Sequence, residues 1–367
     1  MPPKKETASL KTATKLTPAM QQVKAFKEQY PDCILFMRMG DFYETFFEDA
    51  EICSRELDLV LTSRSKDPEG RPVPLAGIPY HAVDLYLPRM IRKGYKVAVC
   101  EQIEDPKLAK GVVKRDVTRV VTPGTAIDAD IIPGAAAHYL LSMAYDAKKK
   151  TAGLAFLDVS TGEFFVEDAD TAAGFDAVSA EIERYNPLEI LIPSDISADA
   201  VSYLTGLLRV ITPVSRAKFE NGAAVLCEQF GVASLEGFDT SSELCISAAA
   251  AAVRYVSETQ KASLTHIRGF SKKYSSDAMI LDAAALRNLE ILTPIRGDRN
   301  DTTLFGFLNR TKTPMGARAL REAVTRPMTS PDKINRSLDA VQHFTEHPVL
   351  LSDVRGILSH LSDIERI

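Results

Sequence analysis

Met39-Gly40-Asp41-Phe42-Tyr43-Glu44-Thr45-Phe46 is the stretch that decides the fold of the first part of this 367-residue chain. It follows a short apolar run at residues 34–38, and Met39-Gly40-Asp41 is typical of a turn. Residues 42–46 then alternate as a strand does. The sequence therefore predicts two strands joined by a turn, with Phe42 and Glu44 on one face of the second strand and Tyr43 on the other.

The spacing of Phe42 and Glu44 is compatible with DNA. Two residues of a strand span about 6.6 Å, close to the height of two stacked base pairs. An aromatic ring can wedge into a base stack while a neighbouring carboxylate bonds an exposed base edge, because a carboxylate repels phosphates and would have to read a base. The alternative is an ordinary hairpin with Phe42 in the core and Glu44 at its rim.

Flanking segments predict an α/β domain around this hairpin. Thr17-Pro18 is typical of a helix N-cap followed by Pro at the first helical position. The other expected elements are a helix over 47–57, a Pro/Gly-rich loop over 67–79, a helix over 82–93 and a strand over 96–100. This domain should close near Thr122-Pro123-Gly124-Thr125, with a linker at Pro133-Gly134. Residues 1–16 are expected to form a flexible tail.

A second α/β segment and a helical segment follow. The second segment is expected to hold a hairpin of 154–159 and 163–166, a helix over 171–185 and a strand over 188–193, and to end near residue 240. From Ser247 the chain is expected to be mostly helical, with long helices at 277–291, 314–323 and 331–346. The last residues, 360–367, are helix-like and stop without a capping residue, so the chain is expected to be cut from something longer.

Composition limits the function classes. The chain has 44 Lys+Arg against 49 Asp+Glu, so any nucleic-acid surface must be a local patch. Residues 89–119 supply such a patch, with nine cations against four anions. Five cysteines with no C-x-x-C pair argue against a disulfide framework and a zinc ribbon. No apolar run reaches the ~18 residues that cross a bilayer, so we expect a soluble, cytoplasmic protein with no membrane partner.

Two motifs suggest enzymes. His343-Phe344-Thr345-Glu346-His347 fits the H-x-x-E-H zinc pattern, but Pro348 should end the helix there and no third ligand is evident, so we expect no metal site. Asp158, on the first strand of the second hairpin, stands where a ribonuclease H-like metal nuclease has a first carboxylate, although Asp capping a turn is commoner. Phosphate-loop, dinucleotide and nucleophile-elbow motifs are absent, so we expect no catalytic residue and no cofactor in this chain.

Several separated blocks resemble the MutS family of DNA mismatch repair proteins. Beside residues 39–46, the resemblance rests on Thr17 to Gln22, Ala76 to Ala82, Cys100 to Ile103, Val120 to Thr125, Asp282 to Ile291 and Thr313 to Gly316, in the family's order. It implies a multidomain fold: an α/β mismatch-recognition domain at 17–130, an α/β ribonuclease H-like connector domain at 131–260, and the start of an all-α core/lever domain at 261–367.

The resemblance also implies a function. Phe42 and Glu44 correspond to the family's Phe-x-Glu motif, a wedge and its hydrogen-bond partner at a mispaired or unpaired base. Arg64, Leu75 and Arg115 occupy places where the family approaches DNA. ATP, Mg²⁺, the ATPase and homodimerisation belong to the full-length family, and a MutL-like protein is the expected partner of the connector. A metal nuclease, or a scaffold that docks a repair partner without binding DNA, are the alternatives.

Overall fold

The computed structural model describes residues 17–67, 69–104, 111–127, 137–206, 210–239, 242–261, 264–273, 278–296 and 300–366. Contacts divide the chain into two compact units, one up to Val121 and the other from Thr122 onward. The predicted tail at residues 1–16 and the predicted linker at Pro133-Gly134 lie outside the described residues. The domain boundaries at residues 130 and 260 stay predictions.

The first unit is built on a five-stranded sheet with the order β3-β2-β1-β4-β5. Its strands are β1 (Cys33–Met39), β2 (Phe42–Phe46), β3 (Leu75–Pro79), β4 (Lys96–Gln102) and β5 (Arg115–Val121). Its helices are α1 (Pro18–Gln29), α2 (Glu48–Leu57), the 3₁₀ turn η1 (Tyr80–Ala82) and α3 (Val83–Arg92). The side chain of Thr17 accepts a hydrogen bond from the amide of Met20, so the predicted N-cap is confirmed.

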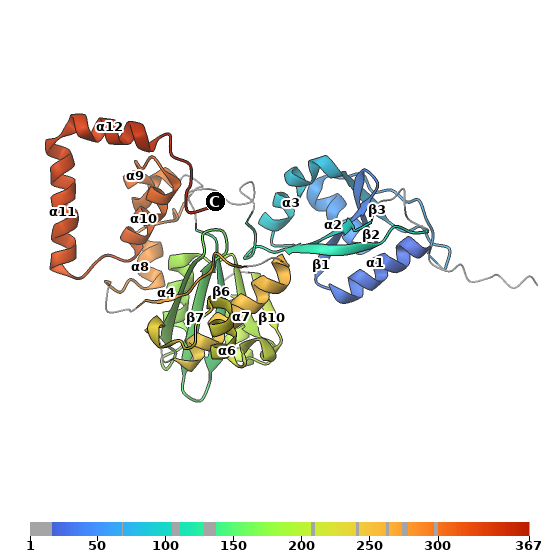
Figure 1. Cartoon of the computed structure of the whole chain (residues 1–367), viewed down its shortest axis with the longest axis horizontal. Helices are drawn as coiled ribbons and strands as arrows, with labels where there is room; N and C mark the ends of the chain where they lie inside the picture. The colour runs from blue at the N-terminus through green and yellow to red at the C-terminus, as the bar shows by residue number, and fades with distance from the viewer. Residues whose placement is uncertain are drawn as a thin grey trace, which may run out of the picture. The chain divides into compact units, whose positions relative to one another are not determined.

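Helices cover both faces of this sheet (Figure 1). On one face α1 lays Met20 and Val23 against Leu35 and Met37 of β1, and on the other face lie α2 and α3. Strand β1 pairs antiparallel with β2 and parallel with β4, so the sheet is mixed. The α/β class predicted for this part is confirmed.

Two strands of the first unit, β3 and β5, were not predicted from the sequence. The predicted loop at 67–79 ends in β3, because Leu75 to Pro79 pairs along β2 despite its Gly and Pro. Pro79 lies at the strand's end, where a missing amide costs no ladder bond. Strand β5 was not predicted either, since its alternation of charged and apolar residues was attributed to a basic surface.

The second unit holds a six-stranded sheet with the order β10-β9-β6-β7-β8-β11. Its strands are β6 (Tyr139–Asp146), β7 (Thr151–Asp158), β8 (Glu163–Asp170), β9 (Glu189–Pro193), β10 (Val210–Val214) and β11 (Ser271–Lys272). The helical elements around it are α4 (Asp176–Tyr185), α5 (Ala198–Thr205), η2 (Arg216–Phe219), α6 (Gly222–Phe230), η3 (Glu236–Phe238) and α7 (Glu243–Gln260). Strands β6 to β8 form an antiparallel meander, and β6, β9 and β10 run parallel. The predicted hairpin is β7 and β8, and the α/β class predicted for this part is confirmed.

Close packing of α7 on this sheet explains the alanine-rich stretch at 248–252. All five alanines are fully buried. Gly153 of β7 lies so near α7 that an added Cβ would stand 2.3 Å from the carbonyl carbon of Leu244. Only small side chains on both elements allow this approach.

The rest of the second unit is helical, as predicted. Its helices are α8 (Ala283–Asn288), the 3₁₀ turn η5 (Asn300–Thr302), α9 (Leu304–Leu308), α10 (Pro314–Thr325), α11 (Pro331–Glu346) and α12 (Pro348–Leu358). The helix predicted over 277–291 is wrong in length, since within the described residues 278–291 only 283–288 is helical. Ala278 bridges to Met328, and Glu290 has a positive φ of 47° that ends the helical geometry. In the part of the chain described, no helix is long and apolar enough to cross a membrane.

Candidate nucleic-acid interface

Phe42 and Glu44 lie on the same face of β2, as the strand period predicts. Phe42 stands opposite Pro79 and Glu44 opposite Gly77 of the neighbouring strand β3. A Cβ added at Gly77 would lie 3.6 Å from Cδ1 of Phe42 and 4.0 Å from Cγ of Glu44. The bare backbone of Gly77 therefore borders both side chains and leaves the space between them open.

Burial of the two side chains contradicts the ordinary-hairpin alternative. Phe42 is 41% exposed, whereas Glu44 is only 7% exposed. The aromatic ring therefore stands at the surface and the carboxylate is sunk beside it, the reverse of a normal core-and-rim hairpin. Exposing a large ring while burying a charge is unfavourable for folding alone, which favours a role in binding.

Two arginines from distant parts of the sequence act on the Glu44 carboxylate. Nη1 of Arg64 lies 2.8 Å from Oε1 of Glu44. Burial raises the pKa of Glu44, and the positive charges of Arg64 and Arg115 oppose that rise. The face therefore holds a buried acid matched by nearby guanidinium groups.

Arg115 is held in place by other groups. Its Nε donates to the carbonyl of Arg38 at 2.7 Å, and its Nη1 donates to the carbonyl of Val113 at 2.9 Å and to Oε1 of Gln22 at 3.2 Å. Burial lowers the pKa of this guanidinium. Arg115 thus links α1, β1 and β5 while placing a fixed positive charge near Glu44.

The sequence resemblance implies that Leu75 contacts DNA. In the structure this side chain lies inside the first unit. It is 5% exposed and packs in the core cluster that contains Phe46 and Val73. Its backbone exchanges two hydrogen bonds with Thr62, each 2.8 Å long. This side chain stabilises β3 from within, and we leave it out of the proposed interface.

The cationic stretch at 89–119 is partly neutralised by acids from outside it. Lys93 pairs with Glu56 at 2.8 Å, and Lys96 pairs with Asp32 at 3.0 Å. Lys107 and Lys110 lie outside the described residues. A count of charges along the sequence therefore overstates this patch, because pairing across the fold removes part of it.

Asp158 is a structural residue in this fold. It is fully buried, and its carboxylate accepts hydrogen bonds from the amides of His138 and Ser160, each at 2.9 Å. Arg366 lies 3.6 Å away. Among the described residues, no three His, Cys, Asp or Glu side chains gather as a metal-binding group would. The structure gives the nuclease alternative no support.

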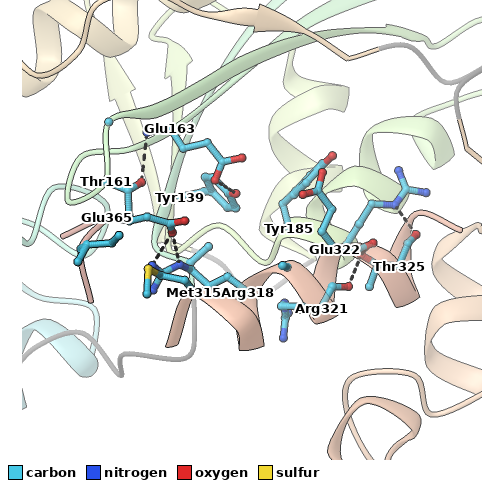
Figure 2. Close-up of a pocket in the computed structure, with 15 residues that line it drawn as sticks. Tyr139, Thr161, Glu163, Tyr185, Met315, Arg318, Arg321, Glu322, Thr325 and Glu365 are labelled. Atoms are coloured by element: carbon cyan, nitrogen blue, oxygen red, sulfur yellow. Dashed lines mark hydrogen bonds and ion pairs between the residues drawn. The ribbon is translucent and has the colours of Figure 1, made fainter. Parts of the chain in front are cut away.

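A cavity of about 550 Å³ adjoins the hairpin formed by β7 and β8 (Figure 2). It lies between the sheet of the second unit and α10, with Tyr139 and Glu163 on one side and Arg318 and Glu322 on the other. Each of its acids has a donor: Tyr139 for Glu163 at 2.7 Å, Lys273 for Glu322 at 2.8 Å and Arg318 for Glu365 at 2.6 Å. The acids are thus engaged in holding the walls together.

The two histidines of the H-x-x-E-H segment lie at a helix end. Helix α11 ends at Glu346 and α12 begins at Pro348, so the predicted helix break is confirmed. The rings of His343 and His347 have centroids 4.5 Å apart at the surface. The absence of zinc stays a prediction.

Together the fold and the face that carries Phe42 and Glu44 define a multidomain protein with a candidate DNA-contacting surface on its first α/β unit. Residues 17–130 match MutS domain I, 138–268 match MutS domain II and 284–367 match MutS domain III. The chain belongs to the MutS family.

Named relatives agree. The chain is 44% identical to the DNA mismatch repair protein MutS of Methanosarcina acetivorans and 44% identical to that of Symbiobacterium thermophilum. Each alignment covers 96% of this chain and 41% of the relative. The MutS protein of Clostridium perfringens is 39% identical, over 96% of this chain and 38% of its own length. The chain therefore spans about two fifths of the length of these relatives.

Proposed function

We propose that this chain recognises mispaired or unpaired bases in double-stranded DNA as the first step of mismatch repair. The observation that carries the proposal is the placement of Phe42 and Glu44 on one face of β2, the ring exposed and the carboxylate sunk beside it. Membership of the MutS family supports it, because its named relatives are DNA mismatch repair proteins.

Phe42 acts as a wedge. A mispair weakens stacking and pairing, so inserting a ring and kinking the helix costs less there than in a perfect duplex. The protein then selects the defect through the energy of deformation, and one aromatic side chain serves many mispairs. The ring is 41% exposed, so part of it is accessible to a base stack.

Glu44 supplies the polar contact. Next to phosphates a carboxylate is repelled, so its partner must be a base edge that the wedge has displaced. The neighbouring charges of Arg64 and Arg115 reduce that repulsion. Phosphate contacts from cations on this unit set the register and add affinity that does not depend on sequence.

The functions of the longer relatives are attributed to this protein only as part of the proposal. ATP and Mg²⁺ binding, the ATPase and homodimer formation are taken to depend on parts of the family that this chain does not match. A MutL-like repair protein is the proposed partner of the connector, and the cytoplasm is the proposed compartment. No step of catalysis is assigned to these residues.

Fluorescence anisotropy at low salt tests the proposal, using labelled duplexes that differ only by one unpaired thymine. The chain should bind the heteroduplex more tightly than the matched duplex. Equal affinity for both would contradict mismatch recognition. No affinity for either would favour a scaffold that docks a partner without touching DNA.

A further inference from the structure

The ion pair between Glu44 and Arg64 has two unlike members. The side chain of Glu44 is 9% exposed, whereas that of Arg64 is 67% exposed. Their contact of 2.8 Å therefore closes a buried carboxylate with a guanidinium that faces solvent. In this arrangement Arg64 holds one of the two carboxylate oxygens, Oε1.

The backbone that carries Arg64 is fixed beside β3. Thr62 exchanges two backbone hydrogen bonds with Leu75, and the amide of Val73 donates to the carbonyl of Ser65 at 2.9 Å. These bonds hold both sides of Arg64 against the sheet, so its side chain starts next to Glu44. Most of the Arg64 side chain is exposed, so it has room to turn toward solvent.

Arg115 differs from Arg64 in this respect. Arg115 makes three hydrogen bonds to the carbonyls of Arg38 and Val113 and to the side chain of Gln22. For Arg64, the contact described is the one to Glu44. The positive charge of Arg115 is therefore fixed by several hydrogen bonds, whereas among the residues described Arg64 bonds to Glu44.

We propose that Arg64 is a positioning residue that controls when Glu44 can read a base. In the free chain its guanidinium occupies the carboxylate. At a mismatch the guanidinium transfers to a DNA phosphate and Glu44 transfers to the displaced base. This inference rests on the proposed function and adds a switch of partners that the Phe-x-Glu motif does not contain.

Electrostatics explains why the exchange would favour a mismatch. A buried carboxylate that loses a directly bonded cation is strongly destabilised, so Arg64 leaves only when another group takes its place. A displaced base provides that group, and a stacked base in a matched duplex does not. The guanidinium then forms a charge-assisted bond to phosphate in the mismatched complex alone.

The first test uses no DNA. The charged groups that act on Glu44 are Arg64 from the loop before β3 and Arg115 from β5. Removing one cation should raise the pKa of Glu44, because the carboxylate keeps its burial and loses a stabilising charge. We would measure this pKa by carboxyl ¹³C NMR in Arg64→Gln, assigning the signal with Glu44→Gln. An unchanged pKa of Glu44 would overturn the inference.

The matched control is Arg55→Gln. The side chain of Arg55 is 65% exposed and paired with Glu56 at 3.0 Å, so it matches Arg64 in exposure and pairing but lies on α2. Its replacement removes the same charge and should leave the pKa of Glu44 and the discrimination between duplexes unchanged. A rise equal to that in Arg64→Gln would also overturn the inference.

The second test compares the salt dependence of binding to matched and mismatched duplexes. One extra phosphate contact steepens the slope of log affinity against log salt by about 0.9. The unmodified chain should show this extra slope only with the mismatched duplex, and Arg64→Gln should lose it together with part of the discrimination.

The outcomes separate the two proposals. If the unmodified chain discriminates and Arg64→Gln keeps both its slope and its discrimination, the switch of partners is wrong and the proposed function stands. If the unmodified chain does not discriminate, the proposed function fails and this inference fails with it.

Discussion

Replacing Phe42 by Ala removes the group that we propose to enter the base stack. The ring is 41% exposed at the start of β2, next to the open backbone of Gly77. Since the ring is partly exposed, the truncation should cost less than the ~3–5 kcal/mol of a fully buried Phe→Ala change, and the variant should stay folded. The effect on DNA binding is thereby separated from folding.

The magnitude follows from stacking. An aromatic side chain stacked on a base contributes about 1–3 kcal/mol, which corresponds to a loss of about 5- to 150-fold in affinity. This loss should fall on the mismatched duplex. Binding to a matched duplex rests on phosphate contacts and should change by less than about 2-fold.

Anisotropy titrations with matched and mismatched duplexes at one low salt concentration measure both affinities. Phe47→Ala is the control, since Phe47 is 40% exposed and belongs to the same unit but precedes α2. Phe47→Ala should keep the discrimination of the unmodified chain. If Phe42→Ala keeps it as well, the assignment of the wedge is wrong.

Four further predictions follow from the same structure and from the resemblance. Glu44→Gln should keep or strengthen the overall affinity for DNA, because repulsion from the phosphates falls, and it should narrow the range of mismatches preferred. A weaker affinity for every duplex would instead indicate that Glu44 has a structural role. Burial lowers the pKa of His138 to about 4, whereas in the unfolded chain this pKa is near 6.5. As the pH falls below about 6.5, the unfolded state therefore binds the proton before the folded state does and is stabilised by it. Urea denaturation should therefore show that the free energy of unfolding falls by on the order of 2 kcal/mol between pH 7 and pH 5, and that this fall is missing in His138→Asn. Equal falls in the unmodified chain and in the variant would refute the prediction. Metal analysis of the purified chain should find no stoichiometric zinc, and zinc that disappears in His343→Ala would overturn this. The chain should sediment mainly as a monomer at micromolar concentration and hydrolyse no ATP, whereas a tight dimer would show that dimerisation determinants lie within it.

Strand periodicity was enough to predict part of the interface. The alternation from Phe42 to Phe46 fixes which side chains share a face, and local sequence determines that property. Which of the two would be buried was not predictable, since burial of Glu44 depends on β3 and on the loop that carries Arg64. Both of these are set by pairing across the fold.

The partner of Glu44 shows the same limit. Arg64 lies twenty residues along the chain and is brought back by the two hydrogen bonds between Thr62 and Leu75. No charge pattern near Glu44 indicates this pairing. Leu75 was placed at the DNA by resemblance alone, and its burial could be recognised only once β3 was known to be a strand.

Tertiary contacts also override helical periodicity. The apolar spacing over 277–291 predicted one long helix, yet the amide of Met279 donates to the carbonyl of Pro327 and draws this end of the segment into an extended pairing. A partner 48 residues away cannot be predicted from a local pattern. By contrast, the cap at Thr17-Pro18 is a local device, and sequence predicted it correctly.

Site-specific photocrosslinking tests the central claim most directly. A photoreactive benzoyl-phenylalanine at position 42 keeps an aromatic ring where Phe42 stands, and sequencing the crosslinked strand locates the contact to a single nucleotide. We expect crosslinks at or next to the mispaired base of a heteroduplex and none concentrated at that position in the matched duplex. Crosslinks spread evenly along both duplexes, or found at the mispair only from the same group at position 47, would contradict the account.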